Sequence, residues 1–127
     1  MERLTDNPEL DEIRRLCLKK PGAEETYPFG DWPICCKVRG KIFAQIYPDK
    51  LTLKCTAFSG EALRQAYPGI VVRGYHCPLV QQPYWNTVYL DRFPKDALPL
   101  LIDHAYEAVL EKLPKKERAL LAEREDL

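Results

Sequence analysis

The chain has 127 residues, the length of one domain, and such a chain buries about two thirds of the surface that its unfolded form exposes. Hydrophobic residues make up 46% and charged residues 30%, and no apolar stretch approaches the ~20 residues of a membrane span. The first six residues include acids where a signal peptide has basic and then apolar residues. We therefore expect a cytoplasmic protein that does not contact a membrane.

The charges are unevenly placed, although the formal net charge is zero. Residues 32–90 carry seven basic and two acidic side chains, a net charge of +5. Residues 1–31 carry five basic and eight acidic side chains (−3), and residues 91–127 carry seven and nine (−2). A basic middle segment favours an anionic partner, and it is also compatible with an ordinary solvated surface.

Neither a catalytic site nor a metal or cofactor site is indicated by the sequence. The five cysteines are an odd number without C-x-x-C spacing, so we expect reduced, mostly buried thiols. The two histidines form no helix-spaced metal pair. His76 adjoins Cys77, but adjacent side chains on an extended chain point apart, so neither would activate the other. We expect a non-enzymatic protein.

The first half of the chain predicts a helix followed by a sheet. Asn7 and Pro8 are typical of an N-cap and a first helical position, and apolar residues recur at helical spacing to about Lys19. Residues 23–29 are compatible with a first short strand. Three strands with short connections follow, at residues 34–38, 41–47 and 51–55.

The second half predicts a short helix, further strands and a long helix. Ser59 or Gly60 is expected to cap the short helix, and an extended piece (70–73), a loop (74–83) and a strand (84–90) follow. From Pro94 to Leu113 an apolar stripe marks the strongest helix signal, which Pro114 ends. We expect one domain over residues 1–114 and a tail, 115–127, that either adds helical turns or frays.

This order predicts an α+β fold, a two-layer sandwich whose antiparallel sheet is backed on one face by the N-terminal and C-terminal helices. Strand alternation assigns side chains to the two faces. Those expected to face the helices are Ile34, Cys36, Val38, Ile42, Ala44, Ile46, Leu51, Leu53, Cys55, Val88 and Leu90. Those expected on the opposite face are Cys35, Lys37, Lys41, Phe43, Gln45, Tyr47, Thr52, Lys54, Trp85, Thr87 and Tyr89.

The second set has the composition of a nucleic-acid platform, because lysines neutralise phosphates and aromatic rings stack on bases. An ordinary solvated sheet face has a similar composition, and Tyr75 with Trp85 could instead close one end of the core. Our leading interpretation is a monomeric DNA-binding protein. Its candidate site residues are Lys37, Lys41 and Lys54 for phosphates, and Tyr75, His76, Trp85 and Asn86 for an adjoining recognition pocket.

Several short motifs, in this order and spacing, resemble the MmcQ/YjbR family of small bacterial proteins. They lie at residues 18–29, 37–44, 53–55, 67–69, 74–76, 85–90 and 103–107. The resemblance implies a frataxin-type or double-wing α+β fold and a DNA-binding role. The segment 77–84 departs from the family pattern, because it is longer and lacks the expected lysine. The frataxin-type fold also implies an alternative, a protein-interaction or metal-chaperone-like module.

Overall fold

The computed structural model describes residues 5–125. The predicted domain and tail extend to residues 1 and 127, so their outermost residues, 1–4 and 126–127, lie outside the described part. The main elements in chain order are α1 (Pro8–Leu18), β1 (Ala23–Thr26), β2 (Ile34–Val38), β3 (Lys41–Ile46), β4 (Lys50–Lys54), α2 (Ala57–Ala66), β5 (Val71–Arg73), β6 (Trp85–Tyr89), α3 (Leu98–Leu110) and α4 (Lys115–Glu125). Single 3-10 turns precede β6 (Gln82–Tyr84) and α3 (Lys95–Ala97).

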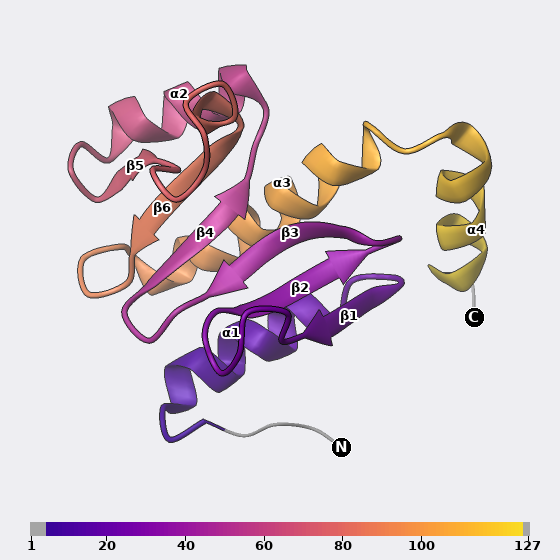
Figure 1. Cartoon of the computed structure of the whole chain (residues 1–127), viewed down its shortest axis with the longest axis horizontal. Coiled ribbons are helices and arrows are strands. Elements are labelled where there is room, and N and C mark those ends of the chain that lie inside the picture. Colours follow the sequence, from indigo (N-terminus) through magenta and orange to yellow (C-terminus); the bar gives the residue numbers. More distant parts are fainter. Residues whose placement is uncertain (1–4, 126–127) are drawn as a thin grey trace.

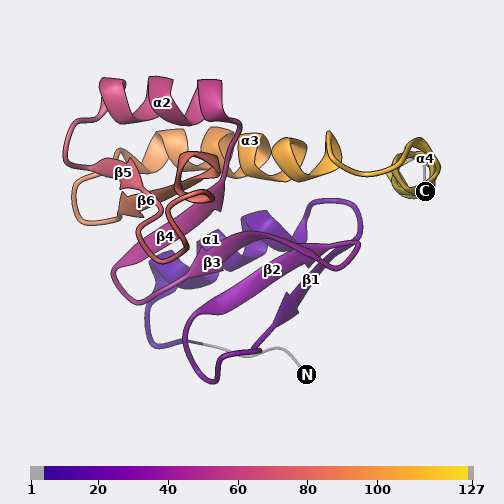
Figure 2. The same ribbon diagram turned by 45° about the horizontal axis from the view of Figure 1, so that its top comes forward.

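The strands form one antiparallel sheet with the order β1-β2-β3-β4-β6-β5. In Figure 1, α1 and α3 lie behind the sheet and leave its front face to the connecting loops. Figure 2 shows α2 beside α3, at the end of the sheet formed by β5 and β6. The predicted two-layer α+β fold is confirmed. Within residues 5–125, no helix is long and apolar enough to span a membrane.

Helix starts follow from side-chain caps that satisfy free backbone N–H groups. The Asn7 side chain accepts a hydrogen bond from the backbone N–H of Glu9 at 2.9 Å, and α1 begins at Pro8 as predicted. Helix α2 begins at Ala57, before the predicted caps Ser59 and Gly60, which lie inside the helix. The reason is Thr56, whose hydroxyl oxygen accepts from the backbone N–H of Ser59 at 3.1 Å and is the actual N-cap.

A buried ion pair fastens α1 to the first strand. The guanidinium of Arg14 is 2% exposed and donates to both carboxylate oxygens of Glu25, at 2.6 and 2.9 Å. A third bond, 3.0 Å long, runs from Arg14 to Asp11. Because an unpaired buried charge is costly, this contact sets how α1 lies against the sheet edge.

A β-bulge at Phe43 corrects the predicted facing of β3. Cys36 pairs with Ala44, and the next residue, Lys37, pairs with Ile42, so Phe43 is an extra residue in β3. Phe43 is fully buried and packs edge-to-face on Tyr106 of α3, with ring centroids 5.5 Å apart. The prediction that Phe43 faces outward and Ile42 faces the helices was therefore wrong, because strict alternation does not continue through a bulge.

Lys41 also departs from its predicted face. It pairs with Val38, a fully buried residue on the helix side of β2, so Lys41 belongs to that side and is exposed only because it starts the strand. The turn between the two strands is formed by Arg39 and Gly40, with φ values of 51° and 79°. Positive φ at both positions is the geometry that matches the twist of a two-residue hairpin.

The centre of the face opposite the helices is buried and neutral rather than basic. Gln45 is 7% exposed, donates to the Cys35 sulfur at 3.9 Å and accepts from the Thr52 hydroxyl at 2.7 Å. Thr87, also buried, donates to the carbonyl oxygen of Arg73 at 3.2 Å. The predicted continuous basic surface is therefore interrupted, and the lysines lie toward the ends of the strands.

The sheet divides into two halves. Strands β3 and β4 pair only between Ala44–Ile46 and Leu51–Leu53, and Figures 1 and 2 show them diverging beyond Ala44. We call β1-β2-β3 the first wing and β4-β6-β5 the second wing. Helix α3 packs against both β3 and β4 and therefore bridges the wings.

The tail is helical over Lys115–Glu125 and lies at the tip of the β2–β3 hairpin (Figure 1). The Arg39 guanidinium reaches Glu117 of α4 at 3.0 Å. Leu121 is 4% exposed and belongs to the core cluster. Within residues 115–121, an ion pair and a buried leucine therefore hold helix α4 to the rest of the domain.

The burial of Phe43 at the bulge leads to a prediction about the stability of the domain. We predict that Phe43→Ala lowers the free energy of unfolding by about 3 kcal/mol or more, because a buried aromatic contact with Tyr106 is lost. Ile42→Ala, the matched neighbour, should cost about 1 kcal/mol. Urea unfolding measures both, and the reverse ranking would show that β3 alternates without a bulge.

Candidate nucleic-acid interface

A cavity of about 600 Å³ opens where the two wings diverge. We call it the wedge, and its lining residues are Gly40, Lys41, Ile42, Lys54, Trp85, Val109, Lys112 and Leu113. Its size lies within the range of about 300–1,000 Å³ that is usual for small-ligand sites. Three lysines around apolar walls indicate a site for a ligand that is both anionic and partly apolar.

Each wall of the wedge comes from a different element. Lys41 and Ile42 begin β3 on the first wing. On the second wing, Lys54 ends β4 and pairs directly with Trp85, the first residue of β6. Val109 near the end of α3 is buried and closes the bottom of the wedge.

The lysines contact aromatic rings rather than carboxylates. The ammonium of Lys54 lies 5.3 Å from the ring centroid of Trp85 and 5.6 Å from that of Tyr84. The ammonium of Lys112 also lies 5.6 Å from the Tyr84 centroid. These cation–π contacts hold two positive charges beside one ring.

The wedge has no compensating negative charge from residues 5–121, whose side chains the structure describes. Among these residues, no carboxylate lies within ion-pair distance of Lys41, Lys54 or Lys112. The pKa of Lys54 is lowered, first by burial and then by repulsion from Lys112. An anion bound between these two ammonium groups would relieve that repulsion.

The loop between β5 and β6 brings an aromatic group to the same end of β6. The backbone N–H of Gly74 donates to the Trp85 carbonyl at 2.9 Å, and a Cβ at residue 74 would lie only 2.4 Å from the Cβ of Trp85. Glycine is therefore needed for this close approach. The approach places the His76 ring edge-to-face with Trp85, 5.4 Å between centroids.

The structure brings together most of the predicted site residues. Lys41, Lys54 and Trp85 line the wedge, and His76 contacts Trp85. Tyr75, in the same loop, is 68% exposed and does not line the wedge. Lys37 lies on the first wing, paired with Ile42 of the wedge.

Asn86 does not belong to the predicted recognition pocket. It is 2% exposed, accepts a hydrogen bond from Arg64 at 2.6 Å and donates to the Gly60 carbonyl at 3.2 Å. Successive residues of β6 face opposite sides of the sheet, so Asn86 points to α2 while Trp85 points away from it. Its contacts hold α2 on the second wing.

Sequence reasoning missed the part of the site that lies at the end of α3, in the turn after it and just before β6, namely Val109, Lys112, Leu113 and Tyr84. Val109 and Leu113 were recognised only as part of the helical stripe. Lys112 did not stand out as a binding residue in the sequence, because it follows Glu107 and Glu111 in a segment that is acidic overall. Only the packing of α3 beneath the diverging strands reveals its role.

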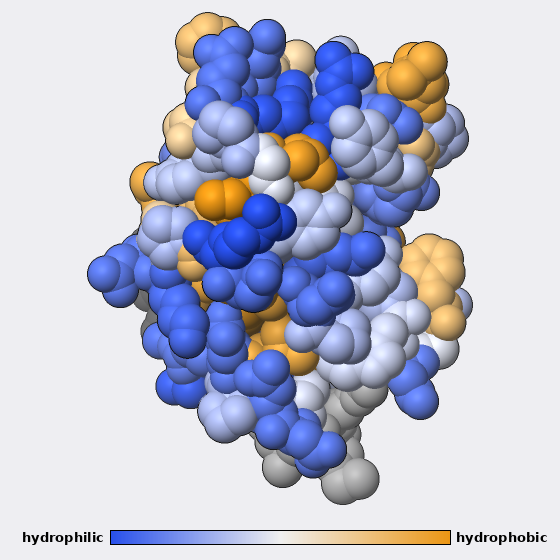
Figure 3. Space-filling model, turned by 90° about the vertical axis from the view of Figure 1, so that its left-hand side faces the viewer, coloured by the Kyte–Doolittle hydropathy of each residue, from blue (hydrophilic) through white to orange (hydrophobic). Residues whose placement is uncertain are grey.

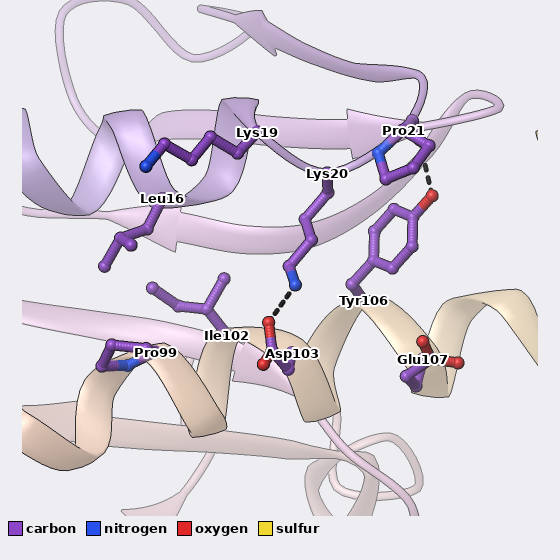
Figure 4. Close-up of a pocket in the computed structure, with 9 residues that line it drawn as sticks. All are labelled: Leu16, Lys19, Lys20, Pro21, Pro99, Ile102, Asp103, Tyr106 and Glu107. Atoms are coloured by element: carbon purple, nitrogen blue, oxygen red, sulfur yellow. Dashed lines mark hydrogen bonds and ion pairs between the residues drawn. The ribbon is translucent and has the colours of Figure 1, made fainter. Parts of the chain in front are cut away.

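A second cavity, of about 610 Å³, lies in the helix layer between α1 and α3 (Figure 4). An ion pair between Lys20 and Asp103 crosses it, and the Tyr106 hydroxyl donates to the Pro21 carbonyl at 2.5 Å. Because Lys20 already has a carboxylate partner and Glu107 adds a further negative charge, this cavity has no clear preference for anions. The wedge is the better candidate.

Other exposed groups are scattered. The large hydrophobic side chains most exposed to solvent include Phe29, Phe58, Leu79 and Val80. Figure 3, which faces the β5 side of the molecule, shows a mainly hydrophilic surface with hydrophobic residues in separate small groups. Within the described residues, no group of three or more His, Cys, Asp or Glu side chains is placed to hold a metal ion.

The fold and the wedge define a class of small two-layer α+β proteins with a divided sheet and a basic cleft beside aromatic residues. The sequence model of the YjbR family matches residues 18–108. The chain belongs to the YjbR family. It is 28% identical over 120 residues to the uncharacterized protein YjbR of Escherichia coli K12, covering 90% of this chain and 98% of that protein.

Two solved structures share the fold. The Deinococcus radiodurans protein DR2400, with a DUF419 domain, superposes with a TM-score of 0.78 at 33% identity, covering 89% of this chain and 87% of the other. A Pseudomonas syringae protein superposes with a TM-score of 0.59 at 17% identity, covering 84% and 97%. The second likeness concerns the fold alone.

The environment of His76 gives a prediction on pH. Burial against Trp85, and then the charge of Lys50, lower its pKa below 6.5. The His76 imidazole therefore binds a proton more readily in the unfolded chain than in the folded one. The neutral, packed imidazole contributes its full stabilisation to the folded state above pH 6.5, and this stabilisation is lost as the pH falls. We expect the His76 imidazole to titrate below 6.5 by NMR, and Lys50→Gln to raise its midpoint. An unchanged midpoint would rule out the influence of Lys50.

Proposed function

We propose that this protein binds DNA, with the wedge as the centre of its contact surface. The observation that carries the proposal is the set of three lysines that line the wedge, Lys41, Lys54 and Lys112. Lys54 and Lys112 lie beside aromatic rings, and none of the three has a carboxylate partner among residues 5–121, whose side chains the structure describes. Phosphates supply the missing negative charge, and this sequence-independent attraction accounts for most of the affinity of non-specific DNA binding.

Aromatic residues at the rim support a nucleic acid over a simple inorganic anion. Trp85 and Tyr84 lie beside the lysines, and His76 and the exposed Tyr75 extend the aromatic surface along the loop. Base stacking on such rings tolerates any sequence, because every base has a π-face. Lys37 of the first wing adds a phosphate contact beside Ile42.

The proposal includes a cytoplasmic location and a monomeric state. All five cysteines are free thiols, and four of them are buried, which supports a reducing compartment. A monomer would present one wedge to one strand, so binding should follow a simple one-to-one isotherm.

The test is a salt titration of binding to short labelled single-stranded and double-stranded oligonucleotides. We predict that Lys37→Gln/Lys54→Gln weakens binding at every salt concentration and lowers the slope of log affinity against log salt by about 0.7–0.9 for each contact removed. Fluorescence anisotropy measures both quantities.

Lys19→Gln/Lys95→Gln is the matched control, because it removes the same charge from the residue that follows α1 and from the 3-10 turn before α3, on the helix side. It should leave the affinity nearly unchanged. Equal losses in the two double variants would mean that binding depends on net charge alone. The absence of binding by the wild-type protein to either DNA form would refute the proposed function.

A further inference from the structure

We propose that the wedge holds one unpaired nucleotide of a single DNA strand, with its phosphate between Lys54 and Lys112 and its base against Trp85 and the apolar floor. This inference rests on the proposed function and deepens it, because it names the form of DNA that the site takes. It makes Lys112, Ile42 and Val109 part of the binding site.

The shape of the wedge favours an unpaired base over a duplex. Its floor and one wall are apolar, formed by Ile42, Val109 and Leu113, and they lie between two strands that have separated. The outside of a duplex offers phosphates and sugars, which would leave the half-buried Ile42 and Trp85 at the surface of the wedge without an apolar partner. A base turned out of the stack brings an apolar face of its own, and that face can cover them.

The charges lie where a phosphate attached to such a base would be. The ammonium groups of Lys54 and Lys112 both lie 5.6 Å from the ring centroid of Tyr84, which is 37% exposed. Lys41, which is exposed, stands on the opposite wing. A strand could therefore pass over the rim with its phosphates toward the lysines while one base points inward.

Rigid placement of the walls supports a preformed site. Lys54 is anchored by the β4–β6 pairing, and the loop that carries His76 is fixed by the Gly74–Trp85 hydrogen bond of 2.9 Å. On the other wall, the bulge buries Phe43 against Tyr106 and so keeps Ile42 at the rim. A preformed site lowers the conformational entropy that is lost on binding.

Two variants separate entry into the wedge from attraction to its surface. Ile42→Trp places a bulkier side chain in the wedge, where it obstructs a base, and keeps every lysine. Lys112→Gln removes one positive charge from the lining. Lys116→Gln, an exposed lysine at the start of α4, is the matched control for Lys112→Gln. The probes are a labelled oligothymidylate and a duplex of the same length.

We expect the wild-type protein to bind the single strand more tightly than the duplex. Ile42→Trp should weaken single-strand binding about tenfold or more, which is the scale of one lost stacking contact, and should leave duplex binding unchanged. Lys112→Gln should weaken single-strand binding more than Lys116→Gln does. The amide NMR signals of Ile42 and Val109 should shift when the single strand is added. If Ile42→Trp does not fold, Lys112→Gln still tests the inference.

The failures are distinguishable. Binding to neither form of DNA would refute the proposed function and this inference together. Duplex binding equal to or tighter than single-strand binding, with no effect of Ile42→Trp or Lys112→Gln, would refute the inference alone. A loss of both single-strand and duplex binding in Lys112→Gln, with Ile42→Trp unaffected, would show that the wedge attracts phosphates but admits no base, which also overturns it.

Discussion

The β-bulge at Phe43 is the constraint on which the rest of the site depends. It turns a large aromatic side chain from the outer face into the core, where Tyr106 of α3 receives it. A bulge also increases local twist, and the pairing of β3 with β4 stops at the next residue, Ala44. The two wings therefore separate at this point, and α3 beneath them becomes the floor of the wedge.

Some charged groups of the domain stabilise the packing of its elements, and others are available to bind a ligand. On the helix side, charged groups are paired: Arg14 with Glu25 in a nearly buried contact, and Lys20 with Asp103 across a cavity. At the wedge, Lys54 and Lys112 are left with aromatic partners, at the cost of mutual repulsion. Positive charges held close together without a counter-ion store electrostatic energy that a phosphate can release, which is why the wedge is the part of the surface suited to an anion.

Much of the fold could be predicted because its signals are local. The N-cap at Asn7, the Arg39-Gly40 turn and the apolar stripe of α3 each depend on neighbours within a few residues. The predicted orientation of Ile42 and Phe43 in β3 was wrong, because a bulge depends on tertiary packing, here that of Phe43 on Tyr106. Asn86 was misplaced for a related reason, since its partner Arg64 lies 22 residues earlier in the chain and cannot be paired with it by counting.

The α+β class, the order of the elements and the basic character of the middle segment all follow from patterns along the chain. So does the choice of three residues that line the wedge, Lys41, Lys54 and Trp85. The tertiary structure alone decided that these three converge, that Lys112 and Tyr84 join them, and that the centre of the outer face is neutral and buried. The physical reason is that periodicity and turn chemistry act along the chain, whereas a cleft forms from the divergence of two strands over a helix far away in sequence.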